Sequence, residues 1–314
     1  MRVAIVGGTG FVGGYLIEQF LDAGLSVSAL VRAGSEKKIP RTNGSQKDGI
    51  DLVPGDIGSQ EALDTVCRDC DAVVYTVGIL REFPAKGITF EESQYLGVQR
   101  TLAAAEKAGV AKFLLMSANG VQVRGTPYQD TKFRAEELLR NGEIDYTIFR
   151  PSIIFGDPSG KMEFATQLYQ DMVAPPIPAL NFFTGWRPAA GSVPMSPVHA
   201  RNVAKAFEVA LRDVSLSRQT LHLGGPEILT WLDMLQRIAE AVGKKKWVVP
   251  MPIGVMKLAA TLLDWLPLFP VTRDQLTMLA EGNTAAPDEL CNIVGERLMA
   301  FDQQQLSYLR KCVE

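Results

Sequence analysis

The chain has 314 residues, of which 46% are hydrophobic and 21% charged, and its formal net charge is −3. This length suits one large α/β domain with a smaller appendage, or two domains, and the apolar content supports a substantial core. The small negative charge gives no electrostatic reason to expect nucleic acid or an anionic membrane as a partner.

The sequence opens with a strand, a glycine turn and a helix. An apolar strand over Val3–Val6 runs into Gly7, Gly10 and Gly13, and an amphipathic helix follows over Phe11–Ala23. Such a turn lets the backbone approach a pyrophosphate closely, and the helix N-terminus behind it favours phosphate. The order of elements predicts a dinucleotide-binding turn, with a tight turn that binds nothing as the less favoured interpretation.

Further strands alternate with helices up to about residue 150. The predicted strands cover Ser26–Val31, Ile50–Pro54, Asp71–Val77, Lys112–Ser117 and Tyr146–Phe149, and the clearest helices between them cover Phe90–Ala108 and Pro127–Arg140. Near-continuous apolar strands separated by helices predict a parallel sheet covered on both faces, a doubly wound Rossmann-type α/β fold. The polar segment Arg32–Gly49 is predicted as a loop.

After Pro151 this alternation ends. Prolines cluster between positions 175 and 197, which predicts irregular structure, and helices return over Ala200–Arg212, Thr230–Val242 and Val255–Leu266. We predict a dinucleotide-binding Rossmann domain over residues 1–155 and a smaller, mostly helical substrate domain over residues 156–314. We expect a strand and helix within about 193–225 to pack back on the Rossmann sheet, and the rest to form a lid over the carboxyl ends of its strands.

Arg32 distinguishes between the two nicotinamide cofactors. Enzymes that select NAD place an acid about 20 residues past the glycines, but the sequence has no Asp or Glu between Asp22 and Glu36. Arg32 stands there, with Lys37 close behind, and a guanidinium can pair with a 2′-phosphate through bidentate hydrogen bonds. We predict NADP(H) as the preferred cofactor, with NAD(H) as the alternative; a solvated surface arginine is the other interpretation. Asp56 is expected to bind the adenine amino group or to cap the next helix.

A tyrosine and a lysine four residues apart are the catalytic candidates. Tyr128 and Lys132 lie on one side of a helix that Thr126 and Pro127 begin. A phenol with a pKa of about 10 is a poor acid–base catalyst at neutral pH. A cationic lysine beside it would lower that pKa and could also hold the nicotinamide ribose. Because the spacing is common by chance, a surface pair is the alternative.

Four features carry a family resemblance: the glycine turn, Gly55–Ile57, the Tyr128/Lys132 pair and Arg150–Gly156. With them the chain resembles the extended and atypical short-chain dehydrogenase/reductase superfamily, which is NAD-dependent epimerase/dehydratase-like. Within it, the chain is most similar to the branch of the nucleotide-binding accessory subunit of respiratory complex I and its bacterial relatives. That likeness is carried by Val77–Leu80, Met116–Gly120, Pro197–His199, Asn202–Ala204, Leu223–Glu227 and Thr272–Leu276.

The resemblance implies bound NADPH or NADP, a Rossmann domain and a small C-terminal domain. With it we expect cofactor contacts from Gly7, Thr9, Gly10, Phe11, Val12, Gly13, Arg32, Lys37, Asp56, Ile57, Val77, Gly78, Ile79, Lys132, Pro151 and Ile153.

One position departs from the pattern of the enzymes. Extended members usually carry Ser or Thr after the fifth strand to polarise the substrate, and here that position is Ala118. A shift of one residue would bring Ser117 or Asn119 into use, so both are catalytic candidates. Two functions stay open. Tyr128 favours an NADP(H)-dependent oxidoreductase or epimerase, towards which we lean. Ala118 favours a catalytically silent NADPH-binding accessory, assembly or redox-sensing protein.

The expected partner is a small-molecule substrate. It would be apolar or quinone-like if the cleft is lined by Phe182, Phe183, Trp186 and Arg187, which are equally well explained as core residues. The apolar stretch Ile253–Leu266, preceded by Lys244–Lys246, is favoured as a helix buried against the smaller domain or a partner. A membrane-surface helix, and with it peripheral membrane or protein-complex association, is the alternative. The oligomeric state is not predicted.

The cysteines and the N-terminus bear on location. The four cysteines do not form a disulfide framework, which predicts a reducing compartment. Cys67 and Cys70 form one Cys-x-x-Cys, which we interpret as structural because a zinc site needs a second ligand pair; no metal is expected. The sequence opens on a core strand rather than a signal peptide and has no uncharged apolar run of about 18 residues. We therefore expect a cytoplasmic protein without a membrane span.

Overall fold

The computed structural model describes residues 1–39, 41–42, 45–46, 48–185, 192–263 and 273–312, although the side chains of 41–46 and 260–263 are excluded. The chain divides into two compact units. Unit 1 comprises Met1–Arg150, Ala200–His222 and Asn292–Gly295, and unit 2 comprises Pro151–His199, Leu223–Cys291 and Glu296–Glu314.

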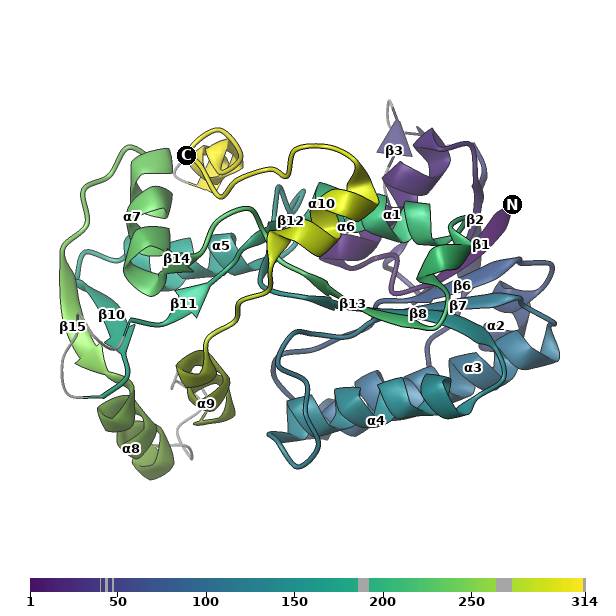
Figure 1. Cartoon of the computed structure of the whole chain (residues 1–314), viewed down its shortest axis with the longest axis horizontal. Helices are drawn as coiled ribbons and strands as arrows, with labels where there is room; N and C mark the ends of the chain where they lie inside the picture. Colours follow the sequence, from purple (N-terminus) through teal and green to yellow (C-terminus); the bar gives the residue numbers. More distant parts are fainter. Residues whose placement is uncertain (40, 43–44, 47, 186–191, 264–272, 313–314) are drawn as a thin grey trace. The chain divides into compact units, whose positions relative to one another are not determined.

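Unit 1 is built on a seven-stranded sheet in the order β13-β8-β7-β6-β1-β2-β5 (Figure 1). In chain order its strands are β1 (Arg2–Val6), β2 (Ser26–Val31), β5 (Ile50–Pro54), β6 (Ala72–Tyr75), β7 (Lys112–Met116), β8 (Asp145–Pro151) and β13 (Gln219–Leu223). Every pair from β5 to β8 is parallel. The strand order reverses between β1 and β6, which is the switch point where ligands of such sheets bind.

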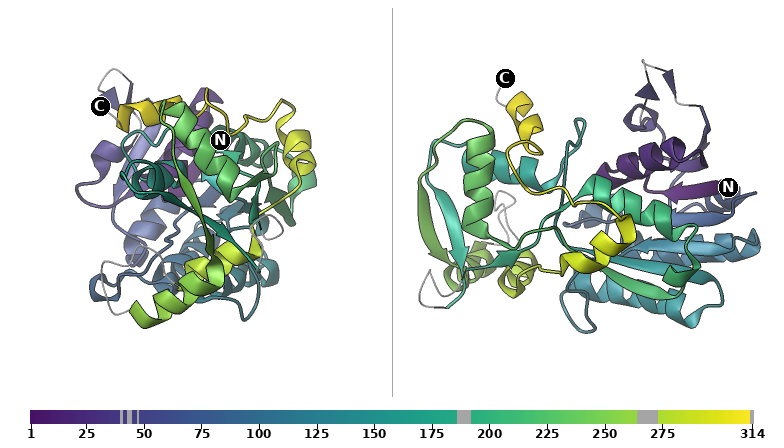
Figure 2. Two further views of the ribbon diagram at one scale, coloured as in Figure 1. Left: turned by 90° about the vertical axis from the view of Figure 1, so that its left-hand side faces the viewer. Right: turned by 45° about the horizontal axis from the view of Figure 1, so that its top comes forward.

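Helices cover both faces of this sheet. They are α1 (Phe11–Asp22), α2 (Gln60–Cys67), α3 (Gly97–Lys107), α4 (Pro127–Asn141) and α6 (Ala200–Ala210). In Figures 1 and 2, α1 and α6 lie side by side on one face, and α2, α3 and α4 cover the other. Fully buried side chains such as Ile5, Leu16 and Phe113 form the core between the layers. The predicted doubly wound fold is confirmed.

Two short stretches of unit 1 differ from the predicted elements. The helix expected over Phe90–Ala108 begins with a π-helical stretch, η3 (Glu91–Leu96), before α3. The segment predicted as a loop contains a short 3-10 helix, η1 (Glu36–Lys38), and a two-stranded hairpin of β3 (Arg41–Thr42) and β4 (Ser45–Gln46).

Unit 2 holds more regular structure than the sequence predicted. Its strands are β9 (Ile154–Phe155), β10 (Ala179–Phe183), β11 (Pro194–Met195), β12 (Val198–His199), β14 (Leu229–Thr230) and β15 (Val248–Pro252). Its helices are α5 (Phe164–Leu168) with a π-helical continuation η4 (Tyr169–Val173), α7 (Trp231–Ala241), α8 (Ile253–Leu263), α9 (Arg273–Glu281) and the 3-10 helix η6 (Ser307–Cys312). Helix α10 (Pro287–Val294) begins in unit 2 and ends in unit 1. Strands β10 and β15 pair in parallel, so the prediction of irregular structure was wrong there. The prolines at 175, 176 and 178 precede β10 and do not interrupt it, and so they leave its ladder intact.

Packing also decides the role of two aromatic residues. Phe182 is 2% exposed and packs at 5.5 Å from the Trp231 ring within the core of unit 2, and Phe183 is also buried. They are core residues, while Trp186 and Arg187 lie outside the described residues. Phe182 and Phe183 therefore give no support to an apolar, quinone-like substrate.

The Cys-x-x-Cys at the end of α2 is buried. Burial raises the pKa of the Cys67 thiol to about 12 and also raises the pKa of Cys70. Both thiols stay protonated at neutral pH and are poor nucleophiles, as a structural role requires.

Of the part of the chain that is described, no helix is both long and apolar enough to cross a membrane.

Phe207 of α6 tests how this helix is anchored. Its ring is fully buried and stacks on Phe149 of β8 at 3.9 Å between centroids. We expect Phe207→Ala to lower the free energy of unfolding by about 3–5 kcal/mol, because it removes a large buried side chain and leaves a cavity. Urea titration followed by circular dichroism measures this. Val214→Ala is the control, since Val214 is 84% exposed; equal effects for both variants would contradict the packing.

Candidate functional site

The glycine turn after β1 is too tight for side chains. Gly7 has φ +108°, and a Cβ there would lie 2.5 Å from Thr76 Oγ1. A Cβ at Gly13 would lie 2.2 Å from the carbonyl oxygen of Gly7, which accepts a 2.9 Å hydrogen bond from Gly10 N. Helix α1 therefore packs directly against the end of the strand. Among the described residues no side chain caps α1, and its first turn holds no acid, which leaves its positive end suited to an anion.

A cavity of about 470 Å³ opens at this turn. It is lined by these predicted cofactor residues: Gly7, Thr9, Gly10, Arg32, Asp56, Ile57, Val77, Gly78 and Ile79. The structure thus brings together the carboxyl ends of β1, β2, β5 and β6, at the switch point of the sheet. Its volume falls within the range of small-molecule and cofactor sites.

Other predicted cofactor residues lie elsewhere. Phe11 and Val12 occupy the first turn of α1, and Gly13 is buried behind it. Lys37 is exposed in η1 and does not line the cavity. Pro151 and Ile153 belong to unit 2.

Sequence reasoning missed several residues of the cavity wall, namely Leu30, Gly55, Gly58, Thr76, Lys86, Gly87, Ile88, Glu92 and Ser93. The positions of Gly55 and Thr76, directly after β5 and β6, were a usable signal, because ligands gather at strand carboxyl ends. The loop residues around Lys86 carried no signal.

Asp56 does not cap α2. Its Oδ1 accepts a 2.8 Å hydrogen bond from Gly58 N, whereas the Ser59 side chain caps the helix by accepting from Ala62 N. The exposed carboxylate also lines the cavity, and binding of the adenine amino group stays a prediction.

Tyr128 and Lys132 lie together on α4, which begins with a Thr126–Gln129 capping box. Lys132 Nζ is 5.8 Å from the centre of the Tyr128 ring and donates to the carbonyl of Met116 at 3.1 Å. A Cβ on Gly78 would lie 3.7 Å from this Nζ, so the ammonium stands just behind the cavity wall. The pair is therefore not a surface pair.

Burial, rather than the lysine, sets the acidity of Tyr128. Burial raises the pKa of the Tyr128 phenol above its usual range. Burial also lowers the pKa of Lys132 to about 8, against the opposing charge of Glu136. This shift is opposite in direction to the one expected from the lysine, and its cause is the loss of hydration on burial. At neutral pH Tyr128 is a protonated acid.

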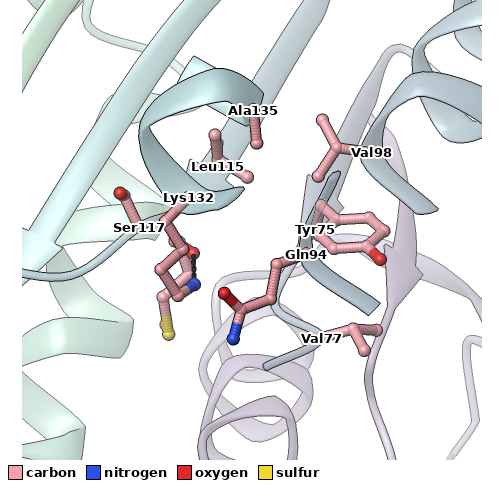
Figure 3. A pocket seen from close by; sticks show the side chains of 9 residues that line it. Tyr75, Val77, Gln94, Val98, Leu115, Ser117, Lys132 and Ala135 are labelled. Carbon is pink, nitrogen blue, oxygen red and sulfur yellow. Dashed lines mark hydrogen bonds between the residues drawn. The ribbon is translucent and has the colours of Figure 1, made fainter. Parts of the chain in front are cut away.

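Gln94 joins the helix of the pair to the cavity wall. Its side chain donates to the carbonyl of Ile79 at 3.0 Å and accepts from the Thr131 hydroxyl at 3.0 Å. Figure 3 shows Gln94 and Lys132 lining one small internal space together with Val77 and Ser117. Gln94 is 2% exposed, and only the fold reveals this role.

Ser117 is not available to orient a substrate. Its hydroxyl donates to the carboxylate of Glu136, which is fully buried. The same carboxylate accepts two hydrogen bonds from Arg150, at 2.9 and 2.6 Å, and one from Arg140 at 2.6 Å. This network ties together the end of β7, helix α4 and strand β8.

Asn119 also has a neighbour that the sequence did not indicate. His222 Nδ1 lies 3.2 Å from Asn119 Oδ1, within hydrogen-bond distance. The half-buried Asn119 amide is thus held by His222, near the end of β13. No local sequence pattern connects these two residues.

Comparison with known proteins assigns the chain to a family. Residues 7–173 match the NAD(P)H-binding family, more than half of the chain, and the chain belongs to that family. The predicted resemblance is confirmed. The chain is 26% identical to mitochondrial NADH dehydrogenase (ubiquinone) 1 alpha subcomplex subunit 9 of Arabidopsis thaliana, covering 96% of this chain and 73% of the relative.

A plant reductase and a solved structure are also similar. Chloroplastic divinyl chlorophyllide a 8-vinyl-reductase of Cucumis sativus is 25% identical, over 87% of this chain and 65% of the relative. The structure of MoeE5 in complex with UDP-glucose and NAD is 17% identical with a TM-score of 0.70 and covers 100% of both chains, which shows a shared fold.

Glu136→Gln tests the buried network. Burial opposes ionisation of Glu136, but hydrogen bonds from Arg150 and Ser117 hold its pKa below 4.5. A lowered pKa contributes stability that is present above pH 4.5 and is lost as the pH falls through the folded-state pKa. We expect the variant to lose about 3–5 kcal/mol of unfolding free energy at pH 7, with the deficit shrinking below pH 4.5. Urea titrations across pH measure both.

Glu137→Gln is the matched control, since Glu137 is 41% exposed and pairs with Arg140 at 2.8 Å. It should cost less than about 1 kcal/mol. A Glu136→Gln deficit that does not change with pH would contradict the role of its charge.

Proposed function

We propose that the chain binds NADP(H) in the glycine-lined cavity and reduces a small molecule bearing a carbonyl group. The observation that carries the proposal is the 470 Å³ cavity, which joins the glycine turn to Arg32. The tight turn and the uncapped N-terminus of α1 suit a pyrophosphate, and Arg32 suits a 2′-phosphate. A reductase among the relatives supports the direction of the reaction.

Tyr128 and Lys132 would carry out the proton transfer of this reaction. When bound, the reduced dinucleotide supplies a hydride to the substrate. Tyr128, which burial keeps protonated, gives its proton to the substrate oxygen. Lys132, with a pKa of about 8, is mostly cationic at pH 7 and stabilises the phenolate left behind.

A second function is favoured by a specific observation. Ala118 stands where enzymes carry a hydroxyl, and the neighbouring Ser117 hydroxyl is held by Glu136. Without a group to polarise the substrate, the same fold would hold NADPH as a silent accessory, assembly or redox-sensing protein. A subunit of NADH dehydrogenase among the relatives supports this alternative.

Arg32→Asp tests the cofactor preference. Mass spectrometry of nucleotide released from purified protein should identify NADP(H). In the variant we expect the Kd for NADPH to rise at least about tenfold, from loss of charge-assisted hydrogen bonds and added repulsion, with the Kd for NADH unchanged or lower. Calorimetry measures both. Lys37→Asp is the control, because Lys37 does not line the cavity. Unchanged preference in Arg32→Asp would overturn the assignment.

Tyr128→Phe separates the two functions. If Tyr128 is the proton donor, kcat for oxidation of NADPH with carbonyl substrates should fall about 100-fold or more, while the Kd for NADPH stays constant. Tyr95→Phe is the control, since Tyr95 stacks on Arg134 and does not line the nucleotide cavity. It is also not part of the Tyr128/Lys132 pair. Absence of turnover in the wild type, with NADPH still bound, would support the silent protein instead.

A further inference from the structure

Unit 2 carries a surface hollow of about 370 Å³ between two loops, which we call the Lys–Trp patch. It is lined by Val173, Ala174, Pro175, Pro176, Ile177, Pro178, Lys244, Lys245, Lys246 and Trp247. The two loops lie side by side because they lead into the parallel strands β10 and β15. Ala179 N donates to the carbonyl of Trp247 at 2.8 Å and fixes this register.

The largest apolar side chains of the patch face solvent. Trp247 is 82% exposed and Ile177 is 65% exposed. Their loops are constrained: Pro176 and Pro178 restrict the backbone on both sides of Ile177, and Lys246 Nζ donates to the carbonyl of Pro175 in the other loop. The exposure therefore belongs to the folded loops themselves, and exposed apolar patches of this kind mark interaction sites.

The positive charge of the patch indicates an anionic partner. Lys244, Lys245 and Lys246 line the same hollow as the two apolar side chains, and none of the described residues lining it is acidic. Lys244 also packs over the Tyr169 ring at 5.5 Å, which holds it near the hollow. This local positive charge contrasts with the net charge of −3 of the whole chain. Tryptophan flanked by lysines is the composition that favours the interface of an anionic bilayer.

We propose that the Lys–Trp patch docks the protein on anionic lipid membranes. Trp247 and Ile177 enter the boundary between headgroups and acyl chains, and the exposed Lys244 and Lys245 face the anionic headgroups. The contact is peripheral and reversible, because it uses two loop tips and a few charges. It is independent of the nucleotide cavity, which lies wholly in unit 1.

Vesicle sedimentation of the full chain tests this proposal. We expect binding to vesicles of phosphatidylcholine mixed with phosphatidylglycerol, weak or no binding to phosphatidylcholine alone, and loss of binding as salt rises. Lys245→Gln should weaken the partition coefficient about fivefold and Trp247→Ala about tenfold. A blue shift of tryptophan emission on binding should disappear in Trp247→Phe.

Matched controls come from unit 1. Lys38→Gln removes an exposed lysine and Val214→Ala trims a side chain that is 84% exposed, and neither should change vesicle binding. The proposal is overturned if anionic vesicles do not bind, if the patch variants bind as the wild type does, or if polyglutamate is bound in preference to vesicles.

Discussion

The close approach of Gly13 to the carbonyl oxygen of Gly7 is the constraint on which the nucleotide site depends. A Cβ in either position would overlap backbone or side-chain atoms, so α1 can begin directly at the end of β1 only with glycine there. This contact aims the N-terminus of α1 at the switch point between β1 and β6. The ends of β2, β5 and β6 then supply Arg32, Asp56 and Gly78 to the same cavity.

The buried carboxylate of Glu136 plays a comparable part for the catalytic candidates. It is anchored by Arg150 of β8 and receives the hydroxyl of Ser117 at the end of β7, so α4 cannot rotate or slide on the sheet without breaking charged hydrogen bonds. Lys132 lies one turn earlier on the same helix and donates to Met116. One ion network therefore fixes the position of the Tyr128/Lys132 pair and also engages the hydroxyl of Ser117.

Much of unit 1 could be predicted because its signals are local. The strands Ser26–Val31 and Ile50–Pro54 coincide with their predicted ranges, since each is a short run rich in apolar residues that ends at a polar residue or a glycine. The pairing of Ser117 with Glu136 and the position of Gln94 could not be predicted, because they depend on contacts between elements far apart in sequence. In unit 2, the prolines before β10 hid a strand whose partner, β15, is about 70 residues away.

The acidity of Tyr128 links the two functions that the site supports. The usual argument for a Tyr/Lys pair needs a phenolate, which the buried phenol here does not provide. A protonated phenol can deliver a proton to a substrate oxygen, as the proposed reduction of a carbonyl group requires. The same protonated phenol is also inert when no polarised substrate oxygen is placed beside it, and Ala118 supplies no hydroxyl for that purpose. Turnover in the proposed reaction would therefore depend on whether the substrate itself presents an oxygen basic enough to accept the proton, as a carbonyl oxygen does when it gains charge from an arriving hydride.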